Sequence, residues 1–304
     1  MITRRTALRL MGSASSASLL AVTRLNSFVR IASASSAADD LAPPLAPGTP
    51  NSPERLALID AFRKQSGALE KKFEPRTHKS DTVMPYRFFR PESSASANGK
   101  LPLVVYLHGS GGLGDDNLKQ LGLGNIFGTR VWLLPENQKR FPCYVAVPQT
   151  DQGWVRYDLT QTEGPAKVLP GLGQGARLAL QIIDALLREF PIDGRRIYVT
   201  GQSMGGAGVW HVIAQRPNLF AAAVPCCASS STEDGAASSN TPLWNFHGDS
   251  DKTVPVSLSR DRIAARRKAG GRPLYTEYPG VDHTSWQWAY TEPALLPWLF
   301  AQHL

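Results

Sequence analysis

Apolar and polar positions divide the chain into strand-like runs that alternate with amphipathic segments. Apolar runs predict strands at residues 83–89, 101–108, 144–149, 196–201, 220–227, 242–248 and 274–280. Apolar residues at helical spacing predict helices at 53–74, 175–190, 204–215, 257–269 and 292–303. Several strands are apolar throughout, as expected when both faces of a parallel sheet are covered. We therefore predict an α/β fold with a mostly parallel central sheet and helices on both faces.

The chain divides by composition into three parts. Residues 54–304 carry a single series of strands and helices, which predicts one catalytic domain. Residues 38–53, rich in Pro and Ala, predict an extended linker. In residues 1–37, Arg4 and Arg5 precede an Ala/Ser-rich stretch, which predicts a twin-arginine export signal and a periplasmic or secreted protein. The alternative is a basic tail that is not cleaved. The apolar run is too short to predict a membrane span.

The net charge argues against a nucleic-acid partner, and the cysteine spacing argues against a zinc site. The net charge is +8, but five of the 33 basic residues lie in the first 37 residues, which leaves +3 for the rest. This balance predicts no nucleic-acid partner, and the run RRK at 266–268 is expected on the solvated face of a helix. Cys143, Cys226 and Cys227 match no zinc spacing and are expected to be buried. A bridge from Cys143 to one of the pair stays open.

A serine surrounded by glycines marks the first candidate for catalysis. The sequence GQSMG, residues 201–205, lies between a predicted strand and a predicted helix. Glycines let the two backbones pass close together, and the sharp turn raises the Ser203 hydroxyl above the sheet edge. Phosphate-binding turns are also rich in glycine, but this turn has neither a G-x-G-x-x-G fingerprint nor a P-loop lysine. We predict Ser203 as a nucleophile.

A serine nucleophile needs a base that is oriented by an acid, and after a turn of this kind the acid comes first in the chain. Asp251 and His283 lie in loops after the last two predicted strands, at the sheet edge where such folds bind ligands. We predict them as acid and base. Asp249 is expected to bond the loop backbone, and Asp282 is too close to His283 in sequence to reach its ring. His247 is expected to serve the turn.

The remaining candidates stabilise charge or bind substrate. The segment HGSGG, residues 108–112, follows a central strand and exposes backbone N–H groups. We predict that the N–H groups of Ser110 and Met204 bind the oxyanion of a tetrahedral intermediate. Trp154 is predicted to contact substrate from a loop at the same edge. This chemistry uses side chains and backbone alone, so we expect no cofactor and no metal.

These segments together resemble a known family. LPLVVYLHGSGGLGDDN, RIYVTGQSMGGAGVW, PLWNFHGDSDKTVPVSLSR and YTEYPGVDHTSWQWAY are similar to α/β-hydrolase esterases once catalogued as predicted peptidases. These are related to the phospholipase/carboxylesterase, feruloyl esterase and polyhydroxybutyrate depolymerase families. The similarity covers roughly residues 83–300. It implies an α/β-hydrolase fold, a triad of Ser203, Asp251 and His283, and HGSGG as the oxyanion loop.

The sequence thus predicts a secreted serine carboxylic-ester hydrolase that works through an acyl-enzyme. Small-molecule, polysaccharide and polyester esters are all open as substrates, and so is the oligomeric state. One alternative is a serine peptidase of the same fold. The other is a non-catalytic binding protein on a hydrolase scaffold, against which the intact Ser–Asp–His order argues.

Overall fold

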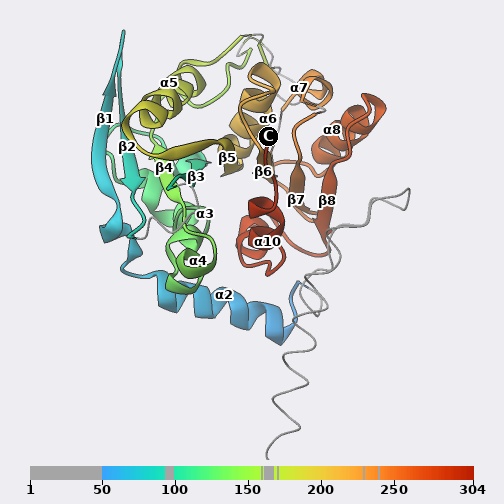
Figure 1. Ribbon diagram of the computed structural model, residues 1–304. Helices are drawn as coiled ribbons and strands as arrows, with labels where there is room; N and C mark the ends of the chain where they lie inside the picture. The colour runs from blue at the N-terminus through green and yellow to red at the C-terminus, as the bar shows by residue number, and fades with distance from the viewer. Residues whose placement is uncertain are drawn as a thin grey trace, which may run out of the picture. The chain divides into compact units, whose positions relative to one another are not determined.

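A sheet of eight strands, in the order β1-β2-β4-β3-β5-β6-β7-β8, forms the centre of the protein (Figure 1). The structure is a computed structural model. It describes residues 50–92, 99–158, 160, 168–169, 171–228, 230–238 and 240–304. The predicted export signal at 1–37 and the predicted linker up to residue 49 lie outside the described residues.

Most of the sheet is parallel, as predicted. The antiparallel part is β1 (Glu74–Lys79) beside β2 (Val83–Phe89), which in turn pairs antiparallel with β4 (Tyr144–Pro148). The strands β3 (Leu101–Leu107), β5 (Ile192–Gln202), β6 (Ala222–Cys226), β7 (Trp244–Gly248) and β8 (Leu274–Tyr278) complete the parallel part. Every residue of β3, β4, β6 and β7 is buried, which explains the uninterrupted apolar runs of the first three.

Helices pack on both faces of the sheet and form two hydrophobic cores (Figure 1). One core takes side chains from α2 (Pro53–Ser66), α3 (Ile126–Arg130), α9 (Trp286–Tyr290) and α10 (Leu295–Phe300). The other takes side chains from α5 (Gln174–Glu189), α6 (Met204–Gln215) and α8 (Ser257–Lys268). The short helices α4 (Pro135–Arg140) and α7 (Thr232–Ala237) complete the set. Among the described residues, no helix combines the length and apolar character that crossing a bilayer requires.

Two predicted elements differ from the structure. The helix predicted for residues 53–74 ends at Ser66, and Glu74 already begins β1. β1 reads EPRTHK and carries no large apolar side chain, so its strand form follows from pairing with β2 rather than from a hydrophobic signal. The helix predicted for residues 292–303 is shorter in the structure, where α10 begins at Leu295, two residues after Pro293, and ends at Phe300.

The structure decides two further expectations, on the cysteines and on the basic run of α8. All three cysteines are free and buried, so the bridge left open at Cys143 is not formed. The expectation of a solvated RRK run is wrong for Arg266, which is 1% exposed. Arg262 and Arg266 lie over the ring of Trp210 and donate to backbone carbonyls of residues 228–241. Buried cations of this kind are stabilised by such donor networks.

Candidate active site

The turn between β5 and α6 has the strained geometry that the glycine cluster predicted. Ser203 has φ 53° and ψ −121°, in the region that residues with a side chain rarely adopt. The backbone holds it there, because the Ser203 N–H donates to the Cys226 carbonyl at 2.9 Å. A Cβ on Gly205 would overlap the carbonyl oxygen of Leu107 on β3. Helix and strand therefore approach so closely that only glycine fits.

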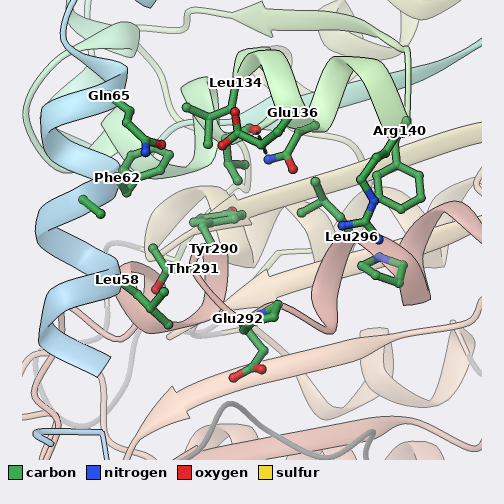
Figure 2. Close-up of a pocket in the computed structure, with 16 residues that line it drawn as sticks. Leu58, Phe62, Gln65, Leu134, Glu136, Arg140, Tyr290, Thr291, Glu292 and Leu296 are labelled. Atoms are coloured by element: carbon green, nitrogen blue, oxygen red, sulfur yellow. Dashed lines mark hydrogen bonds between the residues drawn. The ribbon is translucent and has the colours of Figure 1, made fainter. Parts of the chain in front are cut away.

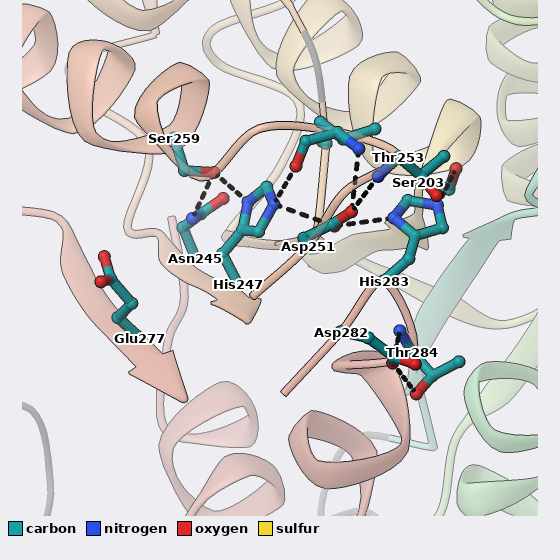
Figure 3. A network of polar contacts seen from close by, with 12 residues as sticks. Ser203, Asn245, His247, Asp251, Thr253, Ser259, Glu277, Asp282, His283 and Thr284 are labelled. Carbon is teal, nitrogen blue, oxygen red and sulfur yellow. Dashed lines mark hydrogen bonds and ion pairs between the residues drawn. The ribbon is translucent and has the colours of Figure 1, made fainter. Parts of the chain in front are cut away.

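The structure brings the three predicted catalytic side chains together in one chain of hydrogen bonds (Figure 3). Ser203 Oγ lies 2.9 Å from His283 Nε2, and His283 Nδ1 lies 2.7 Å from Asp251 Oδ2. Ser203 stands at the end of β5, and the other two follow β7 and β8, so three parallel strands deliver them to one edge. The catalytic roles of these residues stay predictions, to which the geometry is suited.

Asp251 is held as an anion. Its Oδ1 accepts the backbone N–H groups of Thr253 and Val254, each at 2.8 Å, while Oδ2 faces His283. Burial alone would raise the pKa of Asp251, but the side-chain donors His247 and His283 and the backbone donors lower it well below its usual value. A permanent carboxylate fixes the His283 tautomer with its proton on Nδ1, which leaves Nε2 to accept the Ser203 proton.

Asp249 and Asp282, the two other acidic candidates, form no hydrogen bond to the His283 ring, as the sequence predicted. Asp249 Oδ1 accepts the Gly280 N–H at 2.7 Å and so ties two loops together. Asp282 Oδ1 accepts the N–H of Thr284 at 2.8 Å and closes a local turn. Neither carboxylate bonds the His283 ring, which leaves Asp251 as its partner.

Sequence reasoning missed the role of one residue at this site. His247 was expected to serve the turn, but its buried ring places Nε2 3.1 Å from Asp251 Oδ2 (Figure 3). A histidine near the end of a strand, four residues before the acid, is the sequence signal that could have predicted this contact. Trp286 packs edge-on against His283, with ring centroids 5.5 Å apart and planes at 90°.

The predicted oxyanion donors lie at the ends of neighbouring parallel strands. Ser110 begins a 3₁₀ helix three residues after the last residue of β3, and Met204 begins α6 two residues after the last residue of β5. The N–H of a first helical residue has no partner within its helix, so both groups are available to a ligand. The N–H of Gly109, by contrast, is already bonded to Asn125 Oδ1 at 3.0 Å. The assignment of Ser110 and Met204 as donors stays a prediction.

His108 fixes the backbone of this loop from inside. Its Nδ1 donates to the Gly109 carbonyl at 2.8 Å, and its Nε2 accepts the Thr150 N–H at 3.1 Å. Because a backbone N–H can only donate, Nε2 carries no proton and the ring is neutral. Burial lowers the pKa of His108 to about 4 from its ordinary value of 6.5.

Replacement of His108 by glutamine is expected to flatten the pH dependence of stability on the acid side. Below pH 6.5 the unfolded chain binds a proton that the native ring refuses until about pH 4, so native stability falls as the pH decreases through that window. The loss is about 3 kcal/mol across the window. Urea unfolding at pH 7, 5.5 and 4.5 should show a steeper decline for the unmodified protein. Equal slopes in the two proteins would contradict this origin.

Trp154 does not line the site, which corrects its expected role in substrate binding. Its side chain is completely buried, and Nε1 donates to the His108 carbonyl at 2.8 Å. The ring packs edge-on against that of His108, with centroids 4.9 Å apart. A Cβ on Gly208 of α6 would come within 2.5 Å of Trp154, so the helix rests directly on the tryptophan. Trp154 therefore supports the loop of residues 108–112 from behind.

Two cavities differ in their relation to the triad. One of about 580 Å³ lies beside Met204, since a Cβ on Gly153 in its wall would contact Met204 Sδ at 3.4 Å. Its lining includes Gln152, Gly153, Val155, Arg156, Tyr157, Leu169, Gly173 and Gln174. The other, of about 350 Å³, lies between α2, α4 and the segment from α9 to α10 (Figure 2). No triad residue lines it.

One group in the described part of the chain gathers metal-type ligand atoms: Cys227, Asp251 and His283, whose ligand atoms lie within 4.8 Å of one another. Burial raises the pKa of the Cys227 thiol well above its usual value, so it is protonated. Both ring nitrogens of His283 are already engaged by Asp251 and Ser203. The group is therefore the hydrogen-bonded triad with a neutral thiol beside it.

Comparison with known proteins identifies the family of this chain. The sequence pattern of the phospholipase/carboxylesterase family matches residues 92–291, which is about two thirds of the chain. The chain belongs to the phospholipase/carboxylesterase family. This family membership confirms the resemblance inferred from the motifs and the α/β-hydrolase fold.

Three proteins show how similar this member of the phospholipase/carboxylesterase family is to other known proteins. A thermostable esterase of known crystal structure is 35% identical, with a TM-score of 0.70 over 77% of this chain and 64% of that one. The bifunctional acetylxylan esterase/xylanase XynS20E of Neocallimastix patriciarum is 37% identical over 115 residues, or 36% of this chain and 17% of that protein. An uncharacterized secreted protein of Arthroderma benhamiae is 25% identical over 244 residues, or 66% of this chain and 24% of that protein. The chain spans less than two thirds of the length of each.

Proposed function

We propose that the protein is a serine hydrolase of carboxylic esters that uses Ser203 as nucleophile, His283 as base and Asp251 as the acid that orients the base. The observation that carries the proposal is the continuous hydrogen-bond chain from Ser203 Oγ through His283 to Asp251. Membership of the phospholipase/carboxylesterase family and the esterase relatives support the choice of ester bonds.

The geometry suits a two-step reaction. Ser203 Oγ attacks the ester carbonyl carbon while His283 Nε2 takes the hydroxyl proton. The carbonyl oxygen becomes an oxyanion that accepts from the N–H groups of Ser110 and Met204. The C–O bond to the alcohol then breaks, and His283 returns the proton to the leaving oxygen. Water attacks the acyl-enzyme by the same proton route, and the carboxylic acid leaves.

The polar cavity beside Met204 is our candidate for the part of the substrate that lies next to the reacting carbonyl. Gln152 and Gln174 offer amide groups, Arg156 a guanidinium and Tyr157 an aromatic ring. Such a lining favours a polar or aromatic group over a long alkyl chain, because amide and guanidinium groups covered by an alkyl chain would lose water without gaining hydrogen bonds. The predicted polysaccharide and feruloyl-type esters fit this preference.

A panel of substrates tests the proposed bond. Purified protein should cleave p-nitrophenyl acetate and methyl ferulate, while a peptidyl p-nitroanilide should give only the background rate. A fluorophosphonate probe should label Ser203, as located by peptide mass spectrometry. Folded protein that cleaves the anilide and not the esters would favour the peptidase alternative. Protein that is inert to the probe and to every substrate would favour the binding-protein alternative.

We also propose that the protein is exported. Arg4 and Arg5 before an Ala/Ser-rich stretch support export, as does the secreted relative from Arthroderma benhamiae. The twin-arginine route and the division into residues 1–37, 38–53 and 54–304 stay predictions.

A further inference from the structure

A second histidine contacts the carboxylate at the end of the triad. His247, in β7, is completely buried, and its Nε2 lies 3.1 Å from Asp251 Oδ2 and 2.9 Å from the Val254 carbonyl oxygen (Figure 3). Asp251 Oδ2 is the same oxygen that faces His283 Nδ1 at 2.7 Å. One carboxylate oxygen is therefore shared between two imidazole rings.

The hydrogen-bond partners of His247 determine which of its nitrogens carries the proton. Both partners of Nε2 are acceptors, so Nε2 carries a proton. Nδ1 lies 2.7 Å from Ser259 Oγ, which accepts from Asn245 Nδ2 at 3.1 Å. Arg262 Nη2 also donates to that oxygen, at 3.4 Å. With both lone pairs occupied, the Ser259 hydroxyl directs its own proton to Nδ1.

His247 is thus a neutral ring that can only donate toward Asp251. The charged groups around it agree with this assignment. On the α8 side, the Arg262 guanidinium lies behind Ser259 and donates to its hydroxyl oxygen. On the β8 side, Glu277 is in register with His247 but is ion-paired with Arg260. On the remaining side are the Asp251 carboxylate and, beyond it, His283.

We propose that His247 is a positioning residue for the triad: its Nε2–H holds the Asp251 carboxylate in place and shares the negative charge of Oδ2. The inference rests on the proposed function, since it gives His247 a role in the reaction that Ser203 and His283 perform. The backbone N–H groups of Thr253 and Val254 fix Oδ1, and His247 fixes Oδ2, so the carboxylate cannot rotate.

Sharing the charge has a consequence for the base. An oxygen that accepts one strong donor attracts the proton of a second donor less than a bare oxygen does. The His247 donation therefore moderates how strongly Asp251 retains a proton on His283. Without it, His283 would become more basic and the acidic limb of the pH profile of kcat/KM would move to higher pH.

Two substitutions separate the donor from the bulk of the ring. His247→Gln can place an amide N–H near the position of Nε2, because the glutamine chain is about as long as the imidazole. The shorter amide of His247→Asn reaches only the position of Nδ1. We expect kcat with p-nitrophenyl acetate to fall about 10- to 100-fold in the asparagine variant, the range for one lost hydrogen bond to a charged group. KM should stay within about twofold, and the glutamine variant should recover most of the loss.

The pH profile provides the readout that a purely structural role would not move. In the asparagine variant, the apparent pKa of the acidic limb of the kcat/KM profile should increase by about half a pH unit. The proton on His283 Nδ1 should shift downfield in the NMR spectrum as its bond to Asp251 strengthens. Rates are normalised to the fraction of sites that react with a fluorophosphonate, so misfolded protein does not enter the comparison. His211→Asn, which removes another buried histidine bonded to an acid, Asp234, is the control and should leave the limb unmoved.

Three outcomes overturn the proposal. Asparagine and glutamine variants that match the unmodified protein would show that the donation has no effect on the reaction. Equal losses in both variants with an unchanged acidic limb would show a packing role. A shift of the limb in the His211 variant as well would show a general response to a lost buried histidine. Failure of the proposed function looks different, since activity would then survive the loss of the Ser203 hydroxyl.

Discussion

Replacement of Ser203 by alanine is expected to reduce kcat/KM for p-nitrophenyl acetate by about 10⁵- to 10⁶-fold, the loss seen when a triad nucleophile is removed. The reason is that no other hydroxyl stands within 2.9 Å of His283 Nε2 among the contacts described for that nitrogen. The fold should persist, because the Ser203 N–H bond to Cys226 and the tight backbone turn do not involve the hydroxyl. Steady-state kinetics measure the loss of activity, and thermal unfolding measures whether the fold persists.

Ser80→Ala is the matched control for that result. Ser80 is an exposed serine in the turn between β1 and β2, and its hydroxyl contacts only the neighbouring Asp81 among its described bonds. Its loss should change neither kcat nor Tm. Residual ester cleavage above one per cent of the original rate in Ser203→Ala, with the contaminating activity of a mock preparation subtracted, would refute the nucleophile.

Replacement of Gly205 by alanine is expected to cost about 3 to 5 kcal/mol of unfolding free energy, although it adds a single methyl group. The new Cβ would overlap the Leu107 carbonyl oxygen and come within 2.6 Å of its carbonyl carbon. Both atoms belong to the backbone of β3, in the middle of the sheet, so no side chain can move aside. Calorimetry should show a decrease in Tm on the order of 10 °C.

Gly67→Ala provides the comparison for a glycine without such contact. Gly67 follows α2 with helical φ and ψ of −54° and −36°, and a Cβ there would meet nothing within 4 Å. The substitution should leave stability unchanged or raise it by up to about 1 kcal/mol. A similar effect of both substitutions would mean that the cost at Gly205 does not come from the approach of α6 to β3.

The parts of the fold with an apolar signal were predictable from the sequence. The runs at Val83–Phe89 and Leu101–Leu107 and the helix Met204–Gln215 begin at the expected residues because burial sets both their pattern and their structure. β1 was not predictable, since EPRTHK becomes a strand only through its partner. Arg266 was misjudged because a charged residue reads as exposed unless its acceptors, here distant carbonyls, are known.

The candidate site shows the same division. The order of Ser203, Asp251 and His283 and their places after strands were enough to predict that they meet, since strand ends share an edge. The burial of Trp154 and the contact of His247 with Asp251 depend on side-chain packing around the loops. Spacing along the chain does not encode such packing, which is why the first was assigned to substrate and the second to a turn.

The polar composition of β1 has a consequence for the protein at high concentration. Among the residues that the structure describes, β1 is the outermost strand at one edge of the sheet, and an edge strand has backbone groups that another extended chain can pair with. Pro75 has no N–H to donate, Lys79 adds a cation, and Arg76 is ion-paired with Glu189. A proline and charged side chains on an edge strand disfavour its pairing with a second copy. The polar residues that made β1 unpredictable from hydrophobicity therefore also disfavour edge-to-edge aggregation of the sheet.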